Sequence, residues 1–179
     1  MPVITLTTDF GLRDYFVSII KASIYREIPN AKIIDISNSV SPFNHSEAAY
    51  VLKNAYYVFP KNSIHIVGVD SEYSPENKHL LMSFDGHYFI GADNGIFSLL
   101  LEGRNYDKLV EINIHDVSIS SFPVFDIFVK VAGHLSRKGN MQVVGVKTNK
   151  LKEITNVNPV LNQSKNQLLG SVIYIDNFG

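Results

Sequence analysis

The chain has no cysteine, no long apolar run and almost no net charge, and each absence excludes certain kinds of site or partner. Without cysteine it has no disulfide, no thiolate metal site and no cysteine nucleophile, in keeping with the cytoplasmic location that we expect. No apolar run approaches the roughly 20 residues that cross a bilayer, and the N-terminus leads straight into a strand, so we expect neither a membrane span nor secretion. The net charge of −1 shows no excess of positive charge of the kind that binds nucleic acid. A small-molecule partner is therefore the expectation.

Several catalytic motifs are missing as well. The six histidines show no metal-ligand spacing and no HExxH pattern occurs, so we expect no metal site. The chain also lacks a GxSxG elbow, a P-loop and a GxGxxG loop. The sequence therefore supports neither a serine hydrolase with a catalytic triad nor a site that binds nucleotide phosphates.

What the chain has is the composition of a globular protein. Of its 179 residues, 45% are hydrophobic and 18% are charged. This length suffices for one domain with a substantial core and part of a second domain.

Strand-like and helix-like segments alternate over the first 140 residues. Ile20, Ile24 and Ile28 follow Phe16 at intervals of four, which predicts a helix over 16–28. We expect further helices over 44–58 and 94–101 and from Asp126 onward, strands over 3–8, 31–36 (buried) and 64–69, and a hairpin over 80–90 around Asp85-Gly86. This alternation predicts an α/β fold with a mostly parallel sheet flanked by helices.

The character of the sequence changes after residue 140. Residues 147–167 are rich in Asn, Lys, Thr and Gln and show no amphipathic period, whereas 170–178 predicts a new strand. We therefore expect an N-terminal α/β domain over 1–140, a linker or long surface loop over 141–167, and the start of a further domain over 168–179 that is cut short.

Two carboxylates follow predicted strands. In an open α/β sheet, ligands bind beyond the carboxyl ends of the strands. Asp9, in Asp9-Phe10-Gly11, can accept two hydrogen bonds there from a vicinal diol such as a ribose, while Gly11 permits a tight turn. Asp70 leads into a polar loop, a common position for a catalytic or binding carboxylate. A helix cap for Asp9 and simple loop solvation for Asp70 are the alternatives.

Two turns also follow predicted strands. Ser41-Pro42-Phe43-Asn44 presents an aromatic ring that is able to stack on a flat ligand or, alternatively, to staple the helix that Asn44 begins. Asp93-Asn94-Gly95 is explained by turn chemistry and an N-cap alone, so we assign it no chemistry.

Taken in order, these segments resemble one family along nearly the whole chain, the S-adenosylmethionine (SAM) hydroxide adenosyltransferases with their fluorinase and chlorinase relatives. The matching stretches are 6–14, 34–42, 47–49, 67–70, 93–95, 126–128, 134–135 and 170–179. The resemblance implies an N-terminal α/β domain and a C-terminal β-barrel, of which this chain would hold the first strand. It also implies a homotrimer whose ligand lies between neighbouring subunits.

The same resemblance implies roles for single residues. Asp70 matches the first member of the hydrolases' Asp-Arg-His set and is the implied catalytic residue. Asp9 matches the ligand of the ribose diol. The other implied substrate-binding residues are Phe43, Tyr73 and Ser121 on this domain, and Asp176 and Phe178 from the partner-domain side. SAM is the implied substrate, without a metal or a further cofactor.

Two positions depart from the family pattern. The family's arginine falls on Asn77, next to Lys78, and its histidine falls on Pro123, which has neither a polar side chain nor a backbone N–H. Val124 stands where a fluoride-binding serine would sit in a fluorinase.

Three functions follow from this pattern. The first is hydrolysis of SAM to adenosine and methionine by water or hydroxide attack at ribose C5′, with Asp70 and either Lys78 or Tyr73 managing the water. The second is a protein that binds SAM or adenosine without turnover. The third is an enzyme that uses another nucleophile or another adenosyl substrate.

Overall fold

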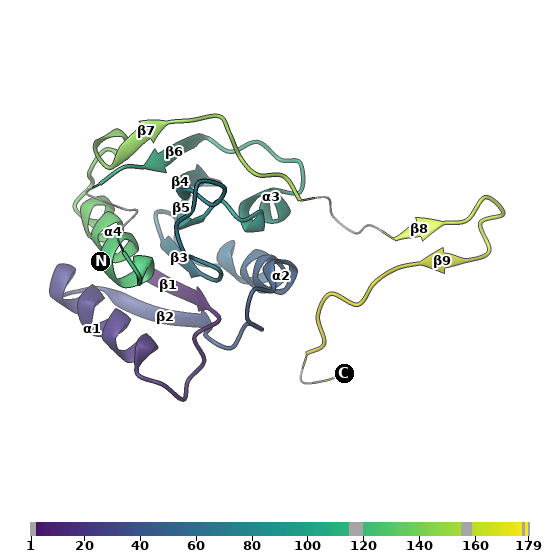
Figure 1. Ribbon diagram of the computed structural model, residues 1–179, viewed down its shortest axis with the longest axis horizontal. Coiled ribbons are helices and arrows are strands. Elements are labelled where there is room, and N and C mark those ends of the chain that lie inside the picture. Colours follow the sequence, from purple (N-terminus) through teal and green to yellow (C-terminus); the bar gives the residue numbers. More distant parts are fainter. Residues whose placement is uncertain (1–2, 115–119, 155–158, 177, 179) are drawn as a thin grey trace.

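A seven-stranded sheet forms the centre of the protein, whose computed structural model describes residues 3–114, 120–154, 159–176 and 178 (Figure 1). Its order is β2-β1-β3-β5-β4-β6-β7. The strands are β1 (Val3–Thr8), β2 (Lys32–Ser37), β3 (Ile64–Gly68), β4 (His79–Phe84), β5 (His87–Ala92), β6 (Lys108–Ile112) and β7 (Gly145–Lys147). The pairings from β2 to β5 are parallel, whereas β4 runs antiparallel to β5 and β6, and β7 to β6. The predicted α/β fold with a mostly parallel sheet is confirmed.

Helices cover both faces of this sheet (Figure 1). One face packs against α1 (Phe16–Glu27), the π-helical turn η2 (Val124–Phe128) and α4 (Val129–Ser136). The other packs against α2 (His45–Tyr56) and α3 (Ile96–Leu101), and a 3-10 turn, η3 (Met141–Val143), precedes β7. Each face has its own apolar core, which contains Phe128 on the first and Phe89 on the second. None of the helices among the described residues combines the length and apolarity of a membrane span.

Local sequence signals explain several of these elements. Ile20 and Ile24 are fully buried, as their spacing predicts for the inner face of α1. The Asn44 side chain accepts a hydrogen bond from the backbone N–H of Glu47 at 3.1 Å and so caps α2. Asp85 and Gly86 both have positive φ, +50° and +72°, which closes the predicted hairpin between β4 and β5 with a tight turn.

The first correction to the sequence-based expectations concerns β2. The strand predicted over 31–36 as buried forms over 32–37 with no fully buried residue, and Ile34 is 42% exposed. The reason is its position, because β2 forms one edge of the sheet and pairs with β1 alone.

A second difference lies after residue 140. Gly145 and Val146, expected in a linker, pair with β6 and extend the sheet. A Cβ at Gly145 would lie 2.0 Å from the carbonyl oxygen of Glu111, so this edge pairing requires a glycine. Because the segment is polar and the strand is short, the sequence pattern does not indicate this edge strand. The division into domains at residue 140 stays a prediction.

The C-terminal segment also departs from expectation. Its strands are β8 (Val160–Leu161) and β9 (Leu168–Leu169), a small antiparallel hairpin that extends away from the α/β body in Figure 1. The strand expected over 170–178 does not form in the described part of that range, 170–176 and 178. Side chains there are exposed, and a strand needs a neighbour to pair with. The β-barrel stays a prediction.

Candidate functional site

The two predicted carboxylates meet at one edge of the sheet. Strands β1 and β3 are parallel neighbours in which Thr8 pairs with Gly68, so Asp9 and Asp70 both follow at the same end. The turns pack closely there, because a Cβ at Gly68 would lie 2.9 Å from Val124 Cγ2 and 3.1 Å from Thr8 Cγ2. The sequence-based placement of this pair at the carboxyl ends of the strands is confirmed.

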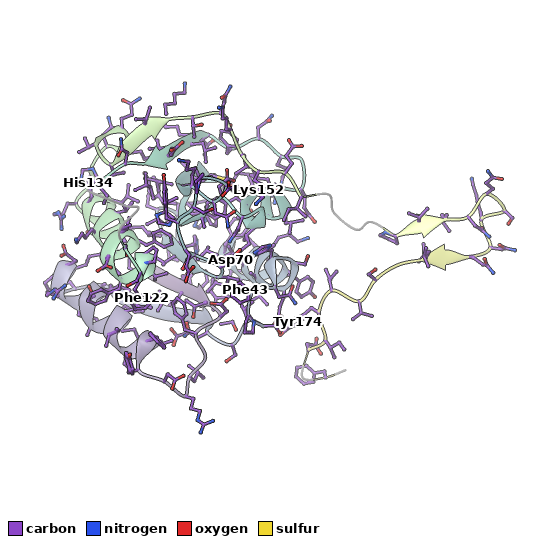
Figure 2. All side chains as sticks on the ribbon, in the orientation of Figure 1. Phe43, Asp70, Phe122, His134, Lys152 and Tyr174 are labelled. Atoms are coloured by element: carbon purple, nitrogen blue, oxygen red, sulfur yellow. The ribbon has the colours of Figure 1, made fainter. Side chains whose placement is uncertain are left out.

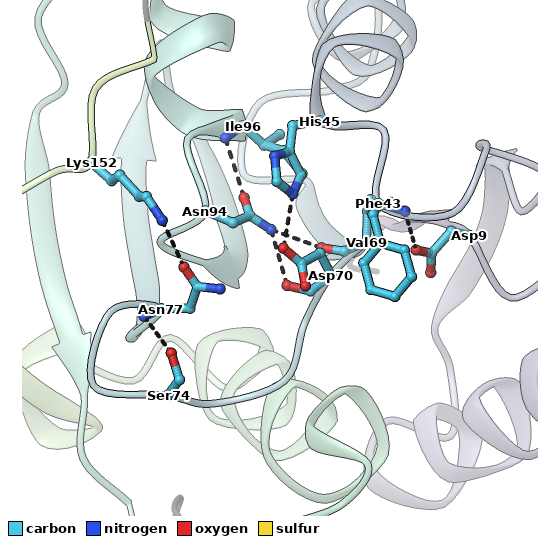
Figure 3. A network of polar contacts seen from close by, with 10 residues as sticks. All are labelled: Asp9, Phe43, His45, Val69, Asp70, Ser74, Asn77, Asn94, Ile96 and Lys152. Atoms are coloured by element: carbon cyan, nitrogen blue, oxygen red, sulfur yellow. Dashed lines mark hydrogen bonds and ion pairs between the residues drawn. The ribbon is translucent and has the colours of Figure 1, made fainter.

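Asp9 is a half-buried carboxylate. Burial raises its pKa above the ordinary value, and the nearby negative charge of Asp70 adds to this. Backbone N–H groups, first that of Phe43, oppose the rise; Phe43 N–H donates to Asp9 Oδ2 at 3.3 Å (Figure 3). The turn that follows needs Gly11, whose φ is +71°. Asp9 is therefore an acceptor held by main-chain donors.

The backbone of Asp70 is held in an unusual conformation. Its φ is +45°, a region that residues with a side chain seldom adopt. The buried amide of Asn94 donates from Nδ2 to the carbonyls of Val69 at 2.9 Å and Asp70 at 3.1 Å, while its Oδ1 accepts from the N–H of Ile96 (Figure 3). Asn94 is more than the turn residue that we expect from the sequence, since it fixes Asp70. The signal for this role is an amide two residues after β5, the strand next to β3.

The carboxylate of Asp70 also has a partner that sequence analysis misses. His45 Nε2 lies 2.9 Å from Asp70 Oδ2, and the two side chains are 26% and 22% exposed (Figure 3). His45 is the first residue of α2, directly after its cap. The available signal is its position in the turn that also carries Phe43.

Phe43 projects from this turn. Its φ is +59° and the residue is 71% exposed. A ring this open does not act as a packed staple for α2, which leaves its face available to a ligand. In Figure 3 the ring lies between Asp70 and Asp9.

Polar groups of the loop after Asp70 bond to one another and to Lys152. Lys78 Nζ donates to Tyr73 Oη at 2.8 Å, and this bond is the main cause of the raised pKa of Lys78. Asn77 donates its N–H to Ser74 Oγ at 3.0 Å and accepts from Lys152 Nζ at 3.0 Å. The hydroxyl of Tyr73, three residues after Asp70, therefore already has a hydrogen-bond partner in Lys78.

The segment around η2 supplies mainly apolar groups. Ser121 is exposed, whereas Pro123 and Val124 are buried at the start of η2. Ser120 Oγ donates to Asp126 Oδ2 at 2.7 Å, which fixes this turn locally. Val124 packs beside Gly68 with a methyl group. A residue that binds a halide at this position would have to be polar.

Asp176 and Phe178 belong to the C-terminal segment that follows β9. Both are exposed, and Asp176 Oδ1 accepts from the N–H of Phe178 at 2.8 Å. Their segment reaches α2 through Tyr174, whose ring lies 5.2 Å from that of Tyr50; Figure 2 shows Tyr174 on this side of the molecule. Among the described residues, no hydrogen bond joins either residue to Asp9 or Asp70.

No group of three or more His, Asp or Glu side chains suited to a metal ion occurs in the part of the chain that the structure describes. The site as described is a carboxylate pair with an aromatic ring, a histidine and an amide. Such a set is able to bind a polyol and a flat ring and to orient a water molecule.

Residues 4–145 match the family described as SAM hydroxide adenosyltransferase N-terminal domain. The chain belongs to this family. Within the SAM hydroxide adenosyltransferases, it is 33% identical over 141 residues to a protein named (R)-S-adenosyl-L-methionine hydrolase from Methanocaldococcus jannaschii, covering 75% of this chain and 53% of that protein. The chain thus spans about half the length of that relative.

Two further proteins are similar to this chain along nearly its whole length. A protein of the same name from Salinispora arenicola is 25% identical over 186 residues, covering 99% of this chain and 70% of the relative. An uncharacterized conserved protein from Thermotoga maritima superposes with a TM-score of 0.85 at 31% identity, covering 99% of this chain and 68% of that one.

Proposed function

We propose that this chain belongs to an enzyme that hydrolyses SAM to adenosine and methionine. Its α/β body forms the part of the active site that binds the nucleoside and the attacking water. The observation that carries the proposal is the carboxylate pair, in which Asp9 and Asp70 follow the same end of the neighbouring parallel strands β1 and β3. Two carboxylates in different surroundings suit two different tasks. The names of the relatives from Methanocaldococcus and Salinispora support the choice of substrate.

Asp9 is the proposed ligand of the ribose. A carboxylate accepts hydrogen bonds from both hydroxyls of a vicinal diol, and the backbone donors around Asp9 hold its oxygens in place. Phe43, with its exposed ring, is proposed to stack on the adenine. Tyr73 and Ser121 are proposed to border the ligand.

Asp70 is the proposed catalytic residue. The oxygen of a water molecule forms a bond to C5′ while the C5′–S bond breaks, and the bonding electron pair goes to sulfur. Methionine then leaves as a neutral thioether, so its departure needs no acid. The protein has to place a partly desolvated water in line with the breaking bond, and Asp70 accepts its proton.

The other wall of the site is proposed to come from a neighbouring subunit of a homotrimer. Asp176 and Phe178 are exposed, and Asp176 makes no hydrogen bond to the carboxylate pair among the described residues. Their side chains are thus free to meet the ligand of another copy. No metal and no further cofactor are part of the proposal.

A second candidate is binding of SAM or adenosine without turnover. Asn77, Lys78 and Pro123 favour it, because the side chains of the first two already bond to Lys152 and Tyr73, and the third offers no polar group.

The deciding experiment is incubation of the full chain with SAM, with and without chloride, followed by chromatography with mass detection. We expect adenosine and methionine above the rate without enzyme. We also expect Asp70→Asn to lower that rate by about 100-fold or more, since it removes the proton acceptor. Asp107→Asn, at the opposite edge of the sheet beside Ser83, is the matched control and keeps the wild-type rate.

The products separate the remaining functions. A 5′-chlorinated adenosine would assign halide as the nucleophile. Bound SAM without any product would assign the binding function instead, and an Asp70→Asn variant as fast as the wild type would exclude Asp70 as the proton acceptor.

A further inference from the structure

We propose that His45 is the positioning residue of the reaction and that it holds the Asp70 carboxylate in the direction of the attacking water. This inference rests on the proposed hydrolase function. It gives His45 the task for which positions 77 and 123 carry no suitable group.

The geometry of the pair defines what His45 does. An ionised carboxylate only accepts hydrogen bonds, so the contact of 2.9 Å requires a hydrogen on His45 Nε2. Asp70 Oδ2 is thereby engaged, and Oδ1 is left to accept from water. Because 22% of the Asp70 side chain and 26% of that of His45 remain exposed, the pair is open toward solvent on one side.

Asp70 is fixed at both of its ends. Asn94 holds the main chain through two carbonyl groups, at a φ of +45°. His45 holds the carboxylate from the first turn of α2. If only the main chain were held, the carboxyl group would rotate about its side-chain bonds. Because the main chain and Oδ2 are both held by hydrogen bonds, the orientation of Oδ1 is fixed. Fixing a reacting group in this way is a recognised source of rate.

Asn77 and Lys78, in the loop that follows Asp70, have other hydrogen-bond partners. The side-chain oxygen of Asn77 accepts from Lys152 Nζ, and Lys78 Nζ donates to Tyr73 Oη. Within the described ranges, His45 is the one side chain that makes a hydrogen bond to the Asp70 carboxylate. The orienting function therefore falls to His45.

The test compares His45→Leu with His45→Gln in the full chain, using adenosine release from SAM. Leucine removes the donor, and we expect kcat to fall by about 10- to 100-fold because the reacting carboxylate is less well oriented, with KM changed less than about threefold. Glutamine places an amide N–H at similar reach, so we expect His45→Gln to retain most of kcat. His134→Leu, whose parent side chain bonds the carbonyl of Asn140 on the opposite face, is the control.

A double-mutant cycle identifies the route of the effect. If His45 acts through Asp70, the variant that combines His45→Leu with Asp70→Asn is no slower than Asp70→Asn alone. Independent, multiplying losses would overturn the proposal, as would a His45→Leu variant with the wild-type kcat or a His45→Gln variant as slow as His45→Leu. A wild-type protein that binds SAM without releasing adenosine would instead refute the hydrolase function, and this inference with it.

Discussion

Asp9 shows how the surroundings of one residue set the conditions under which it works. Its carboxyl group accepts from the N–H of Phe43, lies close to Asp70 and is half withdrawn from water. Burial is the largest of these influences and raises its pKa. The ionised form accepts from both hydroxyls of a ribose more strongly than the neutral acid does, so protonation of Asp9 weakens ligand binding.

The sign of this shift predicts a pH dependence of binding. Since the pKa of Asp9 is raised, affinity for adenosine falls on acidification at a pH above the ordinary 3.8 of an aspartate. Calorimetric titrations between pH 7 and 4 measure it. At pH 7, Asp9→Asn is expected to bind about 10- to 100-fold more weakly, by loss of charge-assisted hydrogen bonds, and to lose this part of the pH dependence. Equal affinity in the variant would remove Asp9 from the ribose site.

At the scale of elements, the parallel strands share a buried polar row. His65 of β3 lies between Thr5 of β1, with Nδ1 to Oγ1 at 2.7 Å, and His87 of β5, with Nε2 to Nδ1 at 3.2 Å. Burial, with a smaller effect from His87, lowers the pKa of His65 to about 3. Three strands thus depend on one histidine that stays neutral.

This row predicts how stability changes with pH. Below its ordinary pKa of 6.5, His65 takes up a proton in the unfolded chain but not in the folded one. Its contribution is complete above about pH 6.5 and is lost toward pH 3, by up to about 1.4 kcal/mol of unfolding free energy per pH unit. Urea unfolding at pH 8, 6, 5 and 4 measures this slope.

His65→Gln is expected to have the shallower slope. Each protein is compared with itself at pH 8, so the cost of the substitution cancels. Parallel curves for the variant and the wild type would show that His65 is not responsible.

Elements were more predictable than the contacts between them. The spacing of Ile20 and Ile24, the cap at Asn44 and the Asp85-Gly86 turn are local signals, and each predicts its element. The carboxylates follow from strand order, because parallel neighbours end at one edge. Whether Ile34 is buried and which side chains contact Asp70 depend on the placement of whole elements. Periodicity within one segment carries no information on this.

On the scale of the whole molecule, the protein has a tightly packed α/β body and an extended hairpin. The body buries two apolar cores, one on each face of the sheet. The hairpin of β8 and β9 has strands of two residues each and exposes Leu168 and Leu169. Such a segment opens locally at little cost.

Limited proteolysis is expected to separate the two parts. Trypsin should cut first after Lys165, in the turn of this hairpin, and much later after Lys130, which is exposed but helical. Mass spectrometry of timed samples identifies the cuts. Equal resistance at both lysines would contradict the exposure of the hairpin in a single copy, and resistance that rises with protein concentration would show that another copy covers it.

The contacts that fix the two carboxylates have a consequence for folding. They join Phe43 to Asp9, His45 to Asp70 and Asn94 to Asp70 across 34, 25 and 24 residues of chain. No local segment contains them, so they form only when distant strands have paired, which is the slow part of folding an α/β sheet. A refolding chain should therefore gain its ligand affinity after most of its helix content. Nucleoside binding would then report completion of the native sheet more selectively than circular dichroism does.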